Sequence, residues 1–289
     1  MKFGTYFAYW EKEWDADYAA YCKKVAGLGF DILEVAAGGL AEKTDAELFT
    51  IKKAAQDNGI EITSCIGLPP QFDTSSADES VRRAGVEYLK RIMDAMYKVD
   101  SRVLGGIIYA YWPCDYGKPV EKQRAWEAAV KSMQEVADTA RSLDVTLVME
   151  TVNRFEQYII NSAAEAVRFV KDIGKENAKV MLDCFHMNIE EDFIGDAIRA
   201  TGDALGHFHI GEANRKVPGK GHMPWAEMGQ ALRDINYTEA VVMEPFVKPG
   251  GTVGSDIKVW RDISEGASEA QMDEDIRESL VFVKKQFLG

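Results

Sequence analysis

Four short apolar segments in the second half of the chain determine the fold prediction, because each ends on a residue that can bind a metal ion. They are Thr146-Leu-Val-Met-Glu150, Lys179-Val-Met-Leu-Asp183, Gly206-His-Phe-His209 and Ala240-Val-Val-Met-Glu244. Short segments rich in Val and Met, bounded by polar loops, are typical of buried parallel strands. In a closed barrel the carboxyl ends of such strands meet at one mouth, where this architecture places its chemistry. The sequence therefore predicts that Glu150, Asp183, His209 and Glu244 lie together at that mouth.

The rest of the chain alternates between strand-like and helix-like patterns. Strands are predicted near residues 3–9, 31–37, 61–66 and 103–108, and helices near 18–28, 44–58, 81–96, 121–142, 162–173, 190–200, 224–234 and 276–287. Thr44 and Glu47 have capping-box spacing, and Gly59 marks the end of that helix. The paired Gly105 and Gly106 indicate a close backbone approach inside the barrel. Eight strand–helix units predict an α/β protein with one (β/α)8 TIM-barrel domain over residues 1–289.

Composition restricts the classes of partner. The chain has 34 Lys and Arg against 47 Asp and Glu, a formal net charge of −13, which disfavours nucleic acid because a phosphate backbone needs a basic surface. The apolar amino terminus reaches Glu11 and Glu13 too soon for a signal peptide, and no segment approaches the roughly 18 apolar residues of a membrane span. We therefore expect a cytoplasmic protein that contacts no membrane and binds a small molecule.

The four residues at the strand ends favour a metal site when they are taken together. Singly, each acidic residue could cap the following helix or pair with an Arg. Three carboxylates and one imidazole at one mouth would repel one another unless a divalent cation lay between them. Oxygen ligands with a single imidazole suit Mn²⁺, Mg²⁺ or Co²⁺ better than an ion that prefers thiolates, and Zn²⁺ stays open.

The loops that follow these strands supply further polar groups. They include Asn153, Arg154, Glu156, His186, Glu212, Asn214 and Arg215. Loop charges are commonly solvated, but His186 is the strongest candidate because it lies only three positions after Asp183. His207 is predicted to be an interior histidine one layer below His209.

Aromatic residues near strand ends are candidates for the walls of a pocket. They are Tyr6, Trp14, Trp112 and Phe246. Ordinary core packing is the alternative for each of them.

Other catalytic motifs give little support. The Gly250-Gly-Thr-Val-Gly254 segment is neither a dinucleotide fingerprint nor a P-loop, although it follows the last strand, where barrels sometimes bind phosphate. A phosphorylated substrate therefore stays open. The sequence has no G-x-S-x-G elbow and no H-E-x-x-H helix.

Over essentially its whole length the chain resembles the ketose 3-epimerases of the D-tagatose/D-psicose (D-allulose) 3-epimerase family. The resemblance is carried by residues 6–10 (YFAYW), 149–156 (METVNRFE), 181–188 (MLDCFHMN), 206–215 (GHFHIGEANR), 217–221 (VPGKG), 242–246 (VMEPF) and 254–261 (GSDIKVWR). It implies a xylose-isomerase-like barrel and a homodimer or homotetramer.

The resemblance also implies roles for individual residues. Glu150, Asp183, His209 and Glu244 would hold a divalent metal, Mn²⁺ first and Co²⁺ or Mg²⁺ as alternatives, and Glu150 and Glu244 would transfer protons. Substrate contacts would fall on Glu156, His186 and Arg215, with Tyr6 nearby. Trp112 and Phe246, candidates for the pocket wall from their positions, are also predicted to contact substrate. Departures from the family pattern at Ile107, Leu68-Pro69-Pro70, Ile210 and Ala213 concern sugar preference rather than reaction type.

The chemistry of the two glutamates favours epimerisation independently. Inverting C3 of a ketose removes a proton beside the C2 carbonyl and returns one on the opposite face, and a bound metal would stabilise the enediolate between these steps. An aldose–ketose isomerase needs only one base on one face. The expected reactions interconvert D-psicose with D-fructose and D-tagatose with D-sorbose.

Three alternatives stay open. The first is a sugar isomerase or phosphosugar epimerase on the same barrel, including hydroxypyruvate-isomerase-like chemistry. The second is a metal-dependent apurinic endonuclease, which would need more histidines than the four present and basic loops. The third is a non-catalytic barrel that binds a sugar or a partner protein.

Overall fold

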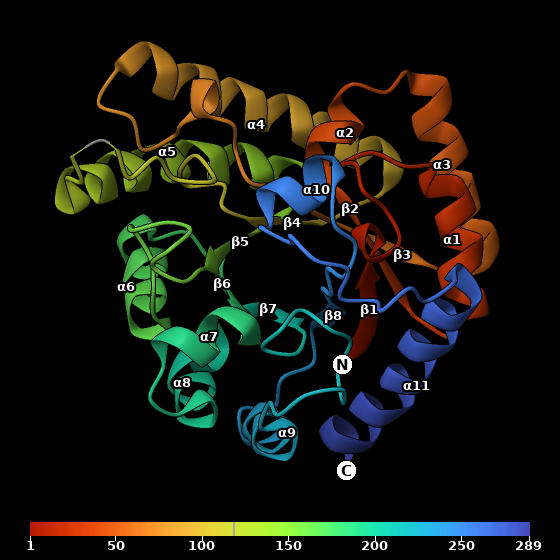
Figure 1. The fold of residues 1–289 in the computed structure, drawn as a ribbon. Coiled ribbons are helices and arrows are strands. Elements are labelled where there is room, and N and C mark those ends of the chain that lie inside the picture. Colours follow the sequence, from red (N-terminus) through yellow and green to blue (C-terminus); the bar gives the residue numbers. More distant parts are fainter. Residues whose placement is uncertain (118) are drawn as a thin grey trace.

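The computed structural model describes residues 1–117 and 119–289, and its strands form a closed parallel barrel in chain order. The strands are β1 (Lys2–Tyr6), β2 (Ile32–Ala36), β3 (Glu61–Cys65), β4 (Val103–Gly106), β5 (Thr146–Thr151), β6 (Ala178–Asp183), β7 (Leu205–Ile210) and β8 (Ala240–Met243). Pairing of β1 with β8 closes the sheet (Figure 1). The TIM barrel predicted from the sequence is confirmed.

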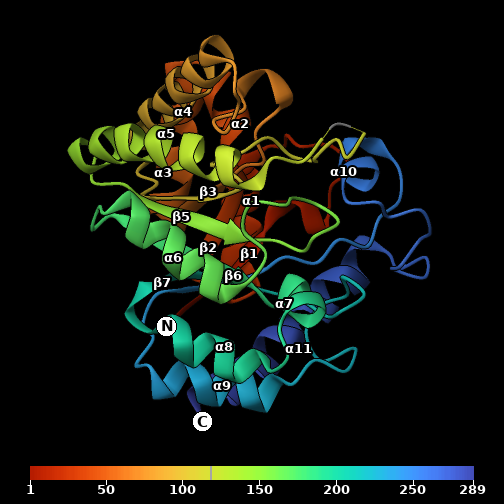
Figure 2. The same cartoon turned by 90° about the vertical axis from the view of Figure 1, so that its left-hand side faces the viewer.

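Long helices surround the barrel, and short ones lie in the segments that follow three of the strands (Figures 1 and 2). The outer helices are α1 (Tyr18–Gly27), α3 (Asp45–Asn58), α4 (Glu79–Val99), α5 (Lys122–Ser142), α6 (Ala163–Ile173), α8 (Ile194–Thr201), α9 (Trp225–Asp234) and α11 (Glu269–Leu288). The short helices are α2 (Ala37–Ala41), α7 (Cys184–Glu190) and α10 (Gly251–Asp256), with 3-10 turns η1 (Phe7–Tyr9), η2 (Pro70–Phe72) and η3 (Gly202–Ala204).

Local sequence signals set several element boundaries correctly. Thr44 and Glu47 form the predicted capping box of α3, and Gly59 ends that helix with a left-handed φ of 66°. A Cβ at Gly106 would lie 2.3 Å from the Ile66 carbonyl oxygen, so the predicted close approach is present.

Three predicted boundaries were wrong. The first strand ends at Tyr6 because Phe7–Tyr9 turn into η1, although they are as buried as the strand. Strand β4 ends at Gly106, whose φ of +100° interrupts extended backbone. The helix predicted at 190–200 begins only at Ile194 as α8, and a separate helix that was not predicted, α7, precedes it, with the Asp183 side chain capping α7 by accepting from Phe185 N.

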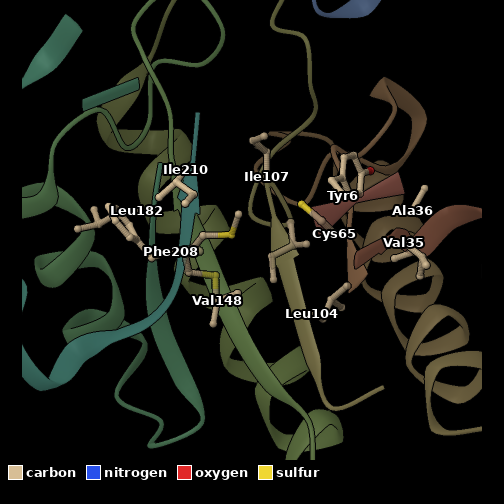
Figure 3. Packing of buried hydrophobic residues seen from close by; sticks show 14 of the residues in the cluster. Tyr6, Val35, Ala36, Cys65, Leu104, Ile107, Val148, Leu182, Phe208 and Ile210 are labelled. Atoms are coloured by element: carbon tan, nitrogen blue, oxygen red, sulfur yellow. The ribbon is translucent and has the colours of Figure 1, made fainter. Parts of the chain in front are cut away.

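The core lies between the barrel and its helices and continues inside the barrel. The inward face of α4 carries Leu89, Ile92, Met93 and Met96, all fully buried. Figure 3 shows Leu104, Val148 and Phe208 in the barrel strands, with Tyr6, Cys65 and Ile107 nearer the mouth. This packing holds the strand ends in fixed positions.

The last helix closes the ring against the first. Lys24 of α1 forms ion pairs with Glu269 and Asp273 of α11. In the described ranges 1–117 and 119–289, no helix combines the length and apolar character needed to cross a bilayer.

Candidate active site

The four residues at the ends of the second-half strands converge on one point, as the sequence predicts. Glu150, Asp183, His209 and Glu244 each offer one ligand atom, and these atoms lie within 4.8 Å of one another. None of the four is more than 8% exposed.

Strand register explains this convergence. Asp183 on β6 lies opposite His209 on β7, and the Glu244 amide, directly after β8, donates to the Ile210 carbonyl at 2.9 Å. Adjacent parallel strands therefore deliver these side chains at about the same height. Glu150 joins them from β5, whose register with β6 pairs it with Met181.

Electrostatics in this group are dominated by buried negative charge. Burial, the nearby Glu244 and Asp183 raise the pKa of Glu150 well above its usual value. The Arg215 guanidinium offsets part of the charge, because its Nη1 donates to Asp183 Oδ2 at 3.2 Å and to Glu244 Oε2 at 3.0 Å. The Arg215 Cζ atom lies 3.6 Å from the centroid of the Phe185 ring and 5.3 Å from the centroid of the Phe246 ring.

The donor set fits a divalent metal ion. The Nδ1 atom of His209 is buried, makes no hydrogen bond to any residue in the described part of the chain and lies 3.4 Å from Glu244 Oε1. An unpaired imidazole nitrogen among three carboxylates has the chemistry of a metal ligand. These residues can therefore hold a divalent cation.

A cavity of about 550 Å³ opens above this group. Its lining includes Glu150 and Glu244 together with all six residues predicted to contact substrate, namely Tyr6, Trp112, Glu156, His186, Arg215 and Phe246. Its size suits a small molecule.

Asn153 fixes the orientation of the His186 ring. Its Oδ1 accepts from Phe155 N at 2.9 Å, which directs Nδ2 to His186 Nδ1 at 2.7 Å and to Glu156 Oε1 at 3.2 Å. The His186 Nδ1 atom is therefore the acceptor, and Nε2 carries the hydrogen. Nε2 lies 3.5 Å from Asp183 Oδ2 and 3.8 Å from Glu150 Oε1.

Comparisons with known proteins agree with the family resemblance seen in the sequence. A sequence profile described as xylose isomerase-like TIM barrel matches residues 22–276. The D-psicose 3-epimerase of Agrobacterium fabrum is 56% identical over 98% of both chains. A crystal structure of D-psicose 3-epimerase in the presence of D-fructose has a TM-score of 0.98 and 55% identity over 100% of both chains. A crystal structure of the D-psicose 3-epimerase from Clostridium cellulolyticum H10 with D-tagatose has a TM-score of 0.98 and 50% sequence identity over 99% of both chains.

The chain belongs to the ketose 3-epimerases of this barrel family. It is an enzyme of the isomerase class. The resemblance inferred from the sequence motifs is confirmed.

Four aromatic rings form one wall of the epimerase cavity, with Trp14 at their centre. The Trp14 ring lies 6.3 Å from Tyr6, 6.1 Å from Phe246 and 6.4 Å from Trp112, centroid to centroid. Hydrogen bonds fix the two indoles, since Trp14 Nε1 donates to Asp256 at 2.8 Å and Trp112 Nε1 donates to Glu156 at 2.9 Å. The acceptors Asp256 and Glu156 also line the cavity, so these two bonds hold the indole rings in place at the cavity surface.

Besides Asn153, three loop residues considered from the sequence lie outside the lining of this cavity. Arg154 is exposed and pairs with Glu190 at 2.7 Å, and Asn214 is also exposed. Glu212 is buried, but it accepts from Gly219 N at 2.7 Å and from Trp225 Nε1 at 2.9 Å. It anchors the loop after β7.

Sequence reasoning missed one buried charge of this epimerase, Glu34 on β2. It is 1% exposed and contacts both His207 and His209. His207 is the interior histidine that the sequence predicts. The available signal was a glutamate in the middle of the apolar strand Ile32-Leu-Glu-Val-Ala36.

Proposed function

We propose that this enzyme catalyses the metal-dependent epimerisation of free ketohexoses at C3, interconverting D-psicose with D-fructose and D-tagatose with D-sorbose. The observation that carries the proposal is the pair Glu150 and Glu244, two buried carboxylates that line one cavity beside a donor set suited to a divalent ion. Relatives that are 50–56% identical are D-psicose 3-epimerases, and two were solved with D-fructose or D-tagatose.

Glu150 and Glu244 are the proposed acid–base pair. One carboxylate removes the C3 proton from one face of the sugar, and the other, protonated, returns a proton to the opposite face. Both groups line the same cavity, and burial together with the nearby Glu244 raises the pKa of Glu150 above its usual value.

Glu150, Asp183, His209 and Glu244 would hold the metal ion, Mn²⁺ first and Co²⁺ or Mg²⁺ as alternatives. When bound, the ion would supply positive charge that stabilises the enediolate oxygens as the C3 proton leaves.

The other cavity residues would bind and orient the sugar. The Nε2–H of His186, the Arg215 guanidinium and the Glu156 carboxylate line the cavity with the acid–base pair and would hydrogen-bond sugar oxygens. Tyr6, Trp112 and Phe246 would pack against the rest of the sugar and exclude water.

The charges around the cavity support an unphosphorylated substrate. Its acidic lining residues are Glu42, Glu150, Glu156, Glu244 and Asp256. The lining guanidinium, Arg215, is already paired with Asp183 and Glu244. A phosphate dianion would meet excess negative charge here, which disfavours the phosphosugar alternative.

The test is incubation of the metal-loaded enzyme with D-psicose, D-fructose, D-tagatose or D-sorbose in heavy water with Mn²⁺. We expect the C3 epimer as product, with deuterium incorporated at C3. Formation of an aldose would indicate an isomerase, and turnover of phosphorylated ketoses alone would indicate a phosphosugar epimerase. If no substrate turns over and a chelator changes neither sugar binding nor thermal stability, the non-catalytic alternative replaces the proposal.

A cytoplasmic location and a homodimeric or homotetrameric assembly remain predictions. Light scattering coupled to size-exclusion chromatography tests the assembly, and fractionation of the source cells tests the location.

A further inference from the structure

We infer that Glu34 is a positioning residue that fixes the His209 ring so that Nδ1 faces Glu150, Asp183 and Glu244. The inference rests on the proposed metal site and deepens it. It assigns a purpose to a buried carboxylate that contacts neither the cavity nor the proposed acid–base pair.

Glu34 reaches across the barrel interior from β2 to β7. Its Oε1 is hydrogen-bonded to His209 Nε2, and its Oε2 lies 2.9 Å from His207 Nε2 and accepts from Thr63 Oγ1 at 2.7 Å. All four side chains are at most 5% exposed. Thr63 is the direct neighbour of Glu34 in the β2–β3 register, so it sets the height of the carboxylate from its own side of the barrel.

Fold stability alone gives little reason for a charge at this depth. Moving a carboxylate out of water carries a penalty, and replacing a buried charged cluster by apolar side chains of similar volume is often neutral or stabilising. Glu34 nevertheless lies here with its two carboxylate oxygens facing the Nε2 atoms of His209 and His207 and the Thr63 hydroxyl, so its contacts are those of a hydrogen-bond acceptor.

The geometry of the imidazole gives the carboxylate its role. The two ring nitrogens point in different directions, so a hydrogen bond at Nε2 determines where Nδ1 points. With Nε2 bonded to Glu34, Nδ1 lies 3.4 Å from Glu244 Oε1, within the proposed ligand group. A ring flip or rotation would break the bond to Glu34, which removes the nonproductive orientations before an ion binds. Carboxylates that orient a histidine ligand in this way typically change metal affinity about 10- to 100-fold.

The experiment measures Mn²⁺ binding to the metal-stripped full chain by isothermal titration calorimetry. We expect the Kd to rise about 10- to 100-fold in Glu34→Leu, which has no acceptor, and by a smaller factor in Glu34→Gln, which keeps one acceptor oxygen. Thr63→Val removes only one donor to Glu34 and is expected to raise the Kd by about two- to fivefold.

Ser64→Ala is the matched control. Ser64 is the neighbour of Thr63 on β3, equally buried, and its hydroxyl is hydrogen-bonded to Ser101 Oγ at 3.0 Å rather than to Glu34. This variant loses a buried hydrogen bond of the same strand, so its Mn²⁺ Kd should stay within about twofold of wild type. If Glu34→Leu does not fold, Glu34→Gln and Thr63→Val carry the test.

Excess metal separates positioning from general structural support. Raising the Mn²⁺ concentration should restore the kcat of Glu34→Gln to within about tenfold of wild type while KM for the sugar changes less than about threefold, because only metal affinity is impaired. A damaged fold would not be rescued by the ion.

Two results would overturn the inference. The first is a Mn²⁺ Kd in both Glu34 variants within twofold of wild type. The second is two Mn²⁺ per wild-type chain and one per Glu34→Leu chain, because Glu34 would then be a ligand itself. Normal Mn²⁺ binding without sugar turnover by the wild type would contradict the proposed function alone, since the titration contains no sugar.

Discussion

The two halves of the barrel contribute different things to the same cavity. In the half formed by β5–β8, the strand ends carry Glu150, Asp183, His209 and, one residue past β8, Glu244. In the half formed by β1–β4, the corresponding cavity residues are Tyr6, Ala36, Cys65 and Ile107, which are apolar or aromatic.

This difference suggests that the β5–β8 half supplies the reacting groups and the β1–β4 half sets the shape of the cavity. Ligands from consecutive strands start close together, so four neighbouring strand ends can share one ion without distorting the barrel. The strand ends of the other half are then free to present uncharged side chains, and we expect these side chains to decide which sugars fit. Glu34 is the exception in the first half, since it acts across the barrel on His209.

The largest expected effect tests the half formed by β5–β8, which carries Glu150 and Glu244. Glu150→Gln and Glu244→Gln each remove a proton-transfer group while keeping side-chain shape, and kcat should fall by at least about 10³-fold. The measurement is the initial rate of C3 epimerisation at saturating Mn²⁺, with circular dichroism to verify the fold. Glu47→Gln is the matched control, because a Gln still serves in the capping box of α3 and its rate should equal wild type. A near-normal rate in either cavity variant would remove that glutamate from the pair.

Metal removal tests the same half without mutation. Dialysis against a chelator should abolish turnover, and Mn²⁺ should restore it. Because the ion binds only the folded state, Mn²⁺ at about 100 times its Kd should stabilise the protein by about 2.7 kcal/mol, seen as a higher Tm in calorimetry. Asp183→Asn should lose most of this metal-dependent shift. Unchanged activity and Tm after chelation would mean that the strand ends of β5–β8 do not act through a bound metal ion.

The sequence alone was sufficient for the barrel and for the convergence of the second-half strand ends. Both depend on local patterns, since an apolar segment that ends on Glu, Asp or His fixes the position of that residue once the strands are parallel. The contact of Glu34 with His209 was not predictable, because β2 and β7 are not neighbours and only barrel curvature brings their side chains together. The ends of β1 and β4 were misplaced because burial continues past Tyr6 and Gly106 into irregular backbone.

A smaller effect is expected at Asn153, which is hydrogen-bonded to His186 in the β5–β8 half. Asn153→Leu leaves His186 Nδ1 without its donor, a loss of about 1–3 kcal/mol for a buried hydrogen bond, so kcat/KM should fall about 5- to 100-fold. A double-mutant cycle with His186→Phe provides the control. If Asn153 acts through His186, its substitution should have little further effect in the His186→Phe background. Fully additive losses would show that Asn153 acts elsewhere, for example through Glu156.

The smallest effect is expected at Ile107, in the half formed by β1–β4. Ile107→Val removes one methyl group from the cavity wall and should cost about 0.5–1.5 kcal/mol of unfolding free energy, with kcat for the best sugar within about threefold of wild type. The ratio of kcat/KM for D-psicose to that for D-tagatose should nevertheless change by about fivefold or more, because one methylene in an apolar pocket is worth about 1–3 kcal/mol of discrimination. Leu104→Val is the matched control, since Leu104 lies deeper, within β4 itself, and outside the cavity lining (Figure 3). It should lose comparable stability and leave the ratio unchanged. If both variants shift the ratio equally, sugar preference follows the rigidity of β4 rather than the shape of the wall.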